Sequence, residues 1–170
     1  CGVSACNSFH FYRLGKLYEM FEKTIQAERA YEESYRINSL NFRALYKIAV
    51  NSLNRKYYDI SRKELEDTLD LLQISTRNLT TISDTVRKLP SLELEYVCKC
   101  YVLLAEVEDK EEHIDYQYYN SCKKVIDLIL EIIEKDENEF IKNMYADYPK
   151  YRQYLKSRLS MNAIKEKVKI

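Results

Sequence analysis

Glycine and proline are scarce in this chain of 170 residues, which has 2 of each and no Trp. A domain of this length at ordinary usage carries about a dozen glycines and about eight prolines. Tight hairpins, phosphate-binding loops and β-bulges need residues that tolerate a positive φ, and glycine is the usual one. The composition therefore excludes a β-sandwich, a Rossmann turn and a P-loop, and it predicts an all-α fold.

Long apolar runs are also missing, since no stretch approaches the roughly 18 apolar residues of a membrane-spanning helix. Lys and Arg together number 27, and so do Asp and Glu, which makes the formal net charge zero. Bulk charge therefore gives no support to the binding of nucleic acid or of a membrane surface. We expect neither a membrane span nor nucleic acid as a partner.

The zero net charge hides two segments of opposite sign. Residues 106–139 hold twelve acids and four bases, whereas residues 150–170 hold seven bases and one acid. Because opposite charges on neighbouring helices attract, we expect these two segments to pack together.

The five cysteines are an odd number, which disfavours a complete disulfide framework. Cys98, Cys100 and Cys122 fall in helical, partly apolar stretches, where a thiol packs as a small hydrophobe. This pattern indicates buried thiols in a reducing compartment, the cytoplasm. The alternative is lipoprotein-type anchoring through Cys1, because a leading Cys-Gly is compatible with a mature lipoprotein. The chain begins without Met, so we expect a processed chain or a fragment of a longer one.

Apolar residues recur at helical spacing along most of the chain, and short connections predict that successive helices pack antiparallel. We expect seven to nine helices and no strands. Residues 58–88 form one helix or two, with a break around 75–78, and the charged run 109–112 is expected to be a loop. The expected helices span residues 8–21, 25–37, 42–54, 58–88, 92–108, 115–135, 137–145 and 149–168.

The same spacing predicts which face of each helix is buried. The first helix is expected to face the core through Phe11, Leu14, Tyr18 and Phe21. The corresponding apolar faces on residues 42–54 and 115–135 are Leu45, Ile48, Ala49 and Leu53, and Val125, Leu128, Ile129, Ile132 and Ile133.

Residues 8–41 carry a more specific pattern, in which an aromatic residue, Leu-Gly and a second aromatic on one helix precede alternating small and aromatic residues on the next. The positions that carry it are Phe11, Leu14, Gly15, Tyr18, Ala27, Tyr31 and Ser34. This unit resembles a tetratricopeptide repeat of 34 residues, with Ser39 where the family usually has Pro. A weaker echo starts at Phe42 and runs to about residue 72, with Ala49 in place of the glycine.

The resemblance implies an α-solenoid of stacked antiparallel helical hairpins, because isolated repeats cannot bury their faces. Residues 8–72 supply the repeats and residues 73–170 supply longer, divergent hairpins, so that residues 1–170 form a single all-helical domain. The alternative architecture is an N-terminal pair of repeats followed by a helical bundle over residues 91–170.

In this family the first helix of each repeat lines a groove that holds a peptide or a partner helix. Carried over to this chain, the groove positions are Phe9, Tyr12, Lys16, Glu19, Arg43, Tyr46, Val50 and Asn54. Tyr12 and Tyr46 occupy sites where a clamp for a C-terminal carboxylate has Lys or Asn, so the groove is expected to take a partner with apolar anchors. The 16 tyrosines of the chain agree with such a groove or with a compositional bias.

Groups that could perform chemistry are few. The chain has 2 His, and it lacks a His-Glu-x-x-His motif, a Gly-x-Ser-x-Gly motif and a glycine-rich loop. A zinc site that combines Cys98 or Cys100 with Cys122 and His113 is conceivable, but buried structural thiols are the preferred interpretation. We therefore expect no enzyme, no metal and no cofactor.

The sequence thus predicts a non-catalytic helical repeat module that binds a protein or peptide, as a scaffold or adaptor. One alternative is a helical sensor or regulatory module that controls an attached effector domain. The other is an RNA-binding helical repeat that uses the basic residues 150–170.

Overall fold

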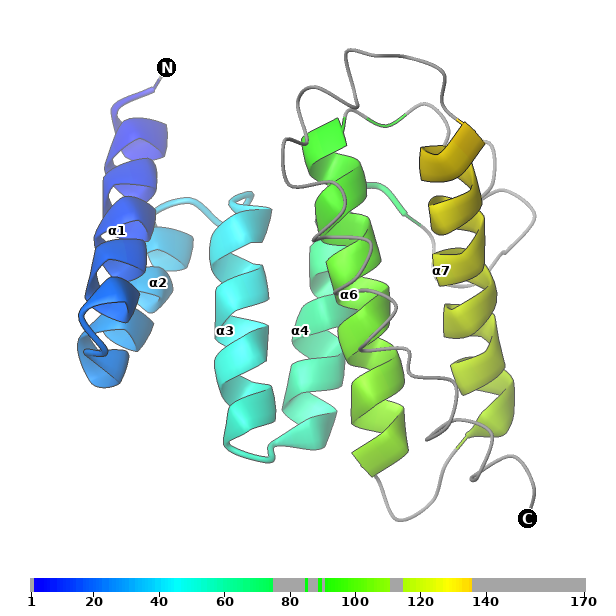
Figure 1. Cartoon of the computed structure of the whole chain (residues 1–170). Coiled ribbons are helices and arrows are strands. Elements are labelled where there is room, and N and C mark those ends of the chain that lie inside the picture. The colour runs from blue at the N-terminus through cyan, green and yellow to red at the C-terminus, as the bar shows by residue number, and fades with distance from the viewer. Residues whose placement is uncertain (1, 75–84, 86–88, 90, 111–114, 136–170) are drawn as a thin grey trace. The chain divides into compact units, whose positions relative to one another are not determined.

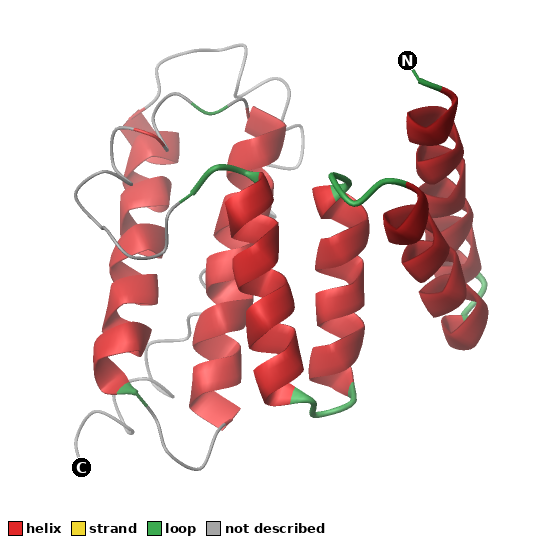
Figure 2. Cartoon of the chain, turned by 180° about the vertical axis from the view of Figure 1, so that it is seen from behind, coloured by secondary structure: helices red, strands yellow, loops and turns green. Residues whose placement is uncertain are grey.

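The computed structural model describes residues 2–74, 85, 89, 91–110 and 115–135, and all regular secondary structure in these ranges is helical (Figure 1, Figure 2). The all-α prediction is confirmed. The chain divides into two compact units, Cys1–Thr76 and Arg77–Ile170.

The described residues contain six helices, fewer than the seven to nine expected. The expected helices 137–145 and 149–168 lie outside the described residues, and so does the expected packing of residues 106–139 against 150–170. The six helices are α1 (Val3–Met20), α2 (Thr24–Ile37), α3 (Phe42–Asn54), α4 (Tyr58–Leu71), α6 (Ser91–Lys110) and α7 (Tyr116–Lys135).

The four helices of the N-terminal unit form two hairpins with matching bounds. Helices α1 and α3 end at Met20 and Asn54, while α2 (Thr24–Ile37) and α4 (Tyr58–Leu71) both begin and end 34 residues apart. Helix α1 packs on α2, α2 on α3, and α3 on α4. Each helix therefore contacts the next one in chain order, as Figure 1 shows for the blue to cyan helices.

Three helix ends in this unit adopt the left-handed conformation without a glycine. Glu22, Lys56 and Gln73, which follow α1, α3 and α4, have φ angles of 56°, 64° and 60°. In each case the N–H of the next residue donates to the carbonyl five residues before it, at 2.9 Å. Helices that end with this hydrogen bond usually carry a glycine at the left-handed position. The scarcity of glycine thus excluded sheets without excluding left-handed turns.

Two predicted helix ends were wrong. Helix α4 ends at Leu71, before the expected break at 75–78, because the left-handed Gln73 turns the chain there. Helix α6 continues to Lys110, into the run 109–112 that was expected to be a loop. The Lys110 ammonium lies 3.2 Å from the Glu106 carboxylate one turn earlier, which supports this last helical turn.

The core of the N-terminal unit is built around two tyrosines. The rings of Tyr12 and Tyr31 are tilted by 49° with their centroids 5.7 Å apart, a favourable aromatic arrangement. Both side chains are buried together with Ala27 and Ala44. The side chains packed against this cluster are Tyr18, Tyr35 and Ile48.

The predicted buried face of α1 was therefore wrong in part. Leu14 and Phe21 are exposed, by 36% and 67%, while Tyr12 and Gly15 are buried. The contact with α2 turns the Gly15 side of α1 inward, because the absent side chain there leaves room for the Tyr31 ring. By contrast, Leu45, Ala49 and Leu53 on α3 are buried as predicted, while Ile48 is half-buried. Leu65 and Leu69 on α4 are buried as well.

A buried network of hydrogen bonds joins α1 to α2 at the end of the first hairpin that lies opposite its turn. The Ser8 hydroxyl donates to the Ser34 carbonyl at 2.7 Å, and the Ser34 hydroxyl donates to the Ser8 carbonyl at 2.6 Å. The Asn41 amide donates to both hydroxyl oxygens, at 3.0 and 3.1 Å. The side-chain Oδ1 of Asn41 accepts from the Ala44 N–H, so Asn41 caps α3 and joins it to the first hairpin.

In the C-terminal unit, α6 packs against α7. Cys98, Cys100 and Cys122 are buried, as the sequence predicted. The buried Glu108 carboxylate accepts the N–H of Asp115 at 2.7 Å and thereby fixes the start of α7. On α7, Val125 and Ile126 are buried and Leu128 is half-buried, while the side chains of Ile129, Ile132 and Ile133 lie outside the described residues.

Candidate functional site

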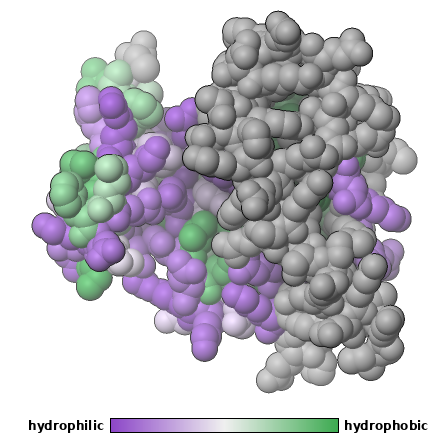
Figure 3. Space-filling model, viewed as in Figure 1, coloured by the Kyte–Doolittle hydropathy of each residue, from purple (hydrophilic) through white to green (hydrophobic). Residues whose placement is uncertain are grey.

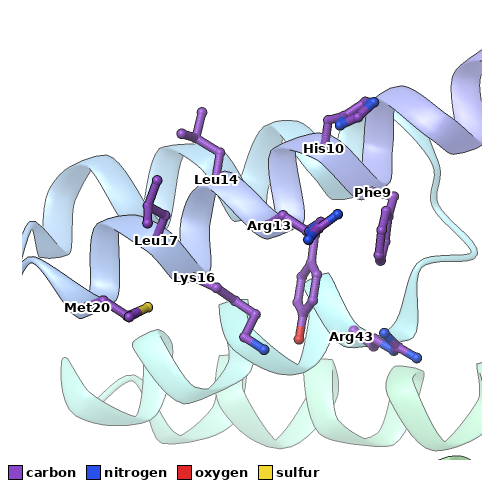
Figure 4. A pocket seen from close by; sticks show the side chains of 9 residues that line it. Phe9, His10, Arg13, Leu14, Lys16, Leu17, Met20 and Arg43 are labelled. Atoms are coloured by element: carbon purple, nitrogen blue, oxygen red, sulfur yellow. The ribbon is translucent and has the colours of Figure 1, made fainter.

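A surface pocket of about 750 Å³ runs along α1 and reaches the start of α3 (Figure 4). All of its described lining residues belong to the N-terminal unit. They are Phe9, His10, Tyr12, Arg13, Leu14, Lys16, Leu17, Met20 and Arg43.

The apolar part of the pocket comes from the side of α1 that α2 does not cover. Phe9, Leu14, Leu17 and Met20 are exposed by 44%, 36%, 48% and 79%. Figure 3 shows hydrophobic atoms in green at the surface of this unit on the α1 side. An exposed apolar row of this kind is a typical interaction surface.

The polar part of the pocket is basic. Figure 4 shows Arg13 and Lys16 on α1 and Arg43 reaching in from α3, and none of the described residues that line the pocket is acidic. The Arg13 guanidinium lies 5.6 Å from the centre of the Phe9 ring, and the Lys16 ammonium lies 5.9 Å from that of Tyr12. These cation–π contacts hold the two charges beside the rings of Phe9 and Tyr12.

Half of the residues predicted to line the groove come together here. Phe9, Tyr12, Lys16 and Arg43 line the pocket, although Tyr12 is largely buried. The other four predicted positions, Glu19, Tyr46, Val50 and Asn54, do not line it.

Those four positions have other surroundings. Glu19 accepts the Lys47 ammonium at 2.9 Å in a contact that joins α1 to α3. Tyr46 is buried, Val50 is half-buried and Asn54 is exposed at the end of α3. Glu19 therefore supports the packing of the hairpins, and Tyr46 contributes to the core.

Sequence reasoning missed five lining residues: His10, Arg13, Leu14, Leu17 and Met20. A signal was present, because α1 carries more apolar residues than one buried face can hold. Its hydrophobic residues surround the helix, so the pattern alone left the choice of inward face open. The contact with α2 decides it.

The Cys100 thiol on α6 is fully buried. Burial raises the pKa of the Cys100 thiol well above its usual range, which keeps it protonated and inert. Within the described ranges no three His, Cys, Asp or Glu side chains gather as metal ligands would. The hypothetical zinc ligand His113 lies outside those ranges.

No family model matches the chain, and no curated protein matches its sequence. Among the helices in the described part of the chain, none combines the length and the apolar character needed to cross a membrane.

Proposed function

We propose that this chain is a non-catalytic binding module and that its N-terminal unit holds a protein or peptide segment in the pocket along α1. The observation that carries the proposal is the pocket itself, in which exposed apolar side chains lie beside the cations of Arg13, Lys16 and Arg43. Apolar anchors with a few charged groups that fix orientation are the usual composition of a recognition surface.

The end of the first helix and both bounds of the second helix recur after 34 residues, which supports a tetratricopeptide-like stack. In such a stack the first helix of each hairpin faces the partner, and the pocket is built from α1 and α3, the first helices of the two hairpins. The absence from the sequence of a nucleophile motif or a glycine-rich loop supports a non-catalytic role. The buried thiols of the C-terminal unit support a reducing, cytoplasmic setting.

Selection from a random peptide library displayed on phage tests this function with the full chain. Peptides enriched on the natural protein are measured by fluorescence anisotropy against Leu17→Asp, which places a carboxylate in the pocket. Ile60→Asp is the matched control, because Ile60 is an exposed residue on α4, 55% accessible and outside the pocket.

We expect Leu17→Asp to weaken binding by about tenfold or more and Ile60→Asp to leave it unchanged. Circular dichroism of both variants establishes that the helices are retained. Equal binding by the natural protein and Leu17→Asp would contradict the proposal.

A further inference from the structure

The charges of the pocket have no ion-pair partner among the residues that the structure describes. Arg13, Lys16 and Arg43 form no ion pair with any residue in the described part of the chain. By contrast, the nearby Lys47 is neutralised by Glu19 at 2.9 Å. The pocket therefore presents positive charge to solvent. A ligand that carries carboxylates would be attracted to these cations.

The apolar side chains of the pocket follow the spacing of a helix ridge. Leu14, Leu17 and Met20 are separated by steps of three residues along α1. In Figure 4 His10, Leu14 and Leu17 project from one side of this helix. Ridges of this spacing pack into the grooves of a second helix, as they do inside helical proteins.

The same features disfavour two other occupants. A second copy that docks through its own α1 brings the two sets of cations together, which repel. A nucleic acid satisfies the cations but leaves the aliphatic row of Leu14, Leu17 and Met20 without apolar contacts. The combination of an apolar row with flanking cations fits a protein helix that is apolar on one face and acidic at its edges.

We infer that the pocket binds an acidic amphipathic helix of a partner protein, with Leu14, Leu17 and Met20 contacting its apolar face and Arg13, Lys16 and Arg43 contacting its carboxylates. This inference rests on the proposed binding function. The lining residues of α1 run from Phe9 to Met20, so the partner helix must be long enough to follow this stretch.

Three fluorescein-labelled peptides as long as α1 test the inference by anisotropy with the full chain. The first carries Leu at helix-face spacing with flanking Glu, the second replaces every Glu by Lys, and the third has the composition of the first in shuffled order. Labelled poly(U) RNA is the fourth probe. We expect the first peptide to bind at least about tenfold more tightly than the other probes, with an affinity that falls as salt is added.

The variant Arg13→Glu/Lys16→Glu/Arg43→Glu is expected to reverse the preference toward the Lys peptide. The matched control Lys23→Glu/Arg29→Glu/Lys56→Glu makes the same charge change at exposed positions outside the pocket, and it should keep the original preference. Circular dichroism checks that both variants keep their helices.

Several results would overturn the inference: equal binding of the Glu and Lys peptides, equal binding of the shuffled peptide, tighter binding of RNA, or an unchanged preference in the pocket variant. A dimer in sedimentation equilibrium that the pocket variant abolishes would assign the surface to a second copy instead, and would also overturn it. If selected peptides depend on Leu17 but are neutral or basic, only this inference fails. If no peptide depends on Leu17, the proposed function fails as well.

Discussion

Gly15 on α1 lies directly against the ring of Tyr31 on α2. A Cβ placed on Gly15 would meet the Cε1, Cδ1 and Cζ atoms of that ring at 2.5, 2.7 and 2.9 Å. The Tyr31 side chain is fully buried. The closeness of the first two helices therefore depends on the missing side chain.

Gly15→Ala should lower the free energy of unfolding by about 1–2 kcal/mol, because an overpacking cost of about 2–3 kcal/mol outweighs the roughly 1 kcal/mol that Ala gains in helix propensity. Urea denaturation followed by circular dichroism measures the change. Gly2→Ala is the control, since the nearest atom to its added Cβ is the Ser4 hydroxyl oxygen at 3.9 Å. An unchanged midpoint for Gly15→Ala would show that the helices separate without cost.

Ser8 and Ser34 bind each other's carbonyl groups, and their hydroxyls also accept from Asn41. Each single change to Ala should cost about 1–3 kcal/mol of unfolding free energy, because buried polar partners are left unsatisfied. The double variant should cost less than the sum of the two, since the groups act as one network. Ser39→Ala, at an exposed turn position, is the control. Strict additivity in the double-mutant cycle would argue against a coupled network.

Lys56 adopts a φ of 64° after α3, a conformation that costs a residue with a Cβ roughly 1–2 kcal/mol. Lys56→Gly removes that cost, and the higher entropy of the unfolded glycine offsets part of the gain. We expect a net stabilisation of about 0.5–1 kcal/mol. Lys63→Gly, the same substitution inside α4, should instead destabilise by about 1 kcal/mol. Thermal denaturation should show a higher midpoint for Lys56→Gly and a lower one for Lys63→Gly. An equal loss of stability in both variants would exclude a cost at the left-handed Lys56.

Burial raises the pKa of the half-buried Glu64, as does repulsion from Asp67 and Glu32, and the hydrogen bond from Ser52 opposes this shift. The folded state therefore binds more protons than the unfolded state, and stability falls as pH rises from the unfolded pKa through the raised folded value. Glu64→Gln should flatten this decline and stabilise the protein at neutral pH by less than about 1 kcal/mol. The measurement is the free energy of unfolding at a series of pH values above 4.5.

The Ser52 hydroxyl provides the opposing test, because it donates to the Glu64 carboxylate at 2.7 Å. Ser52→Ala removes a hydrogen bond that favours the charged form of Glu64, so it should raise the pKa of Glu64 further. The free energy of unfolding should then fall more steeply as the pH rises. A shallower slope for Ser52→Ala would refute this account of the carboxylate.

The positions of several helices could be predicted because their signals are local. Residues 42–54 show apolar side chains at steps of three and four, and α3 has those bounds with Leu45, Ala49 and Leu53 buried. The candidate site was harder to predict. Its residues come from α1 and from the start of α3, and Arg43 joins the others only because α3 packs beside the first hairpin.

The sequence by itself determined the all-helical fold. With two glycines and two prolines the amphipathic chain has few residues for tight turns, and helices satisfy its backbone hydrogen bonds locally. It also placed Gly15 in the repeat-like pattern of residues 8–41. Only the tertiary structure decided which side of α1 is buried, since Tyr12 and Leu14 are both apolar and lie on different faces. Contact with Tyr31 turned Tyr12 inward and left Leu14 beside the cations of the pocket, because each face of a helix can be buried only where another element covers it.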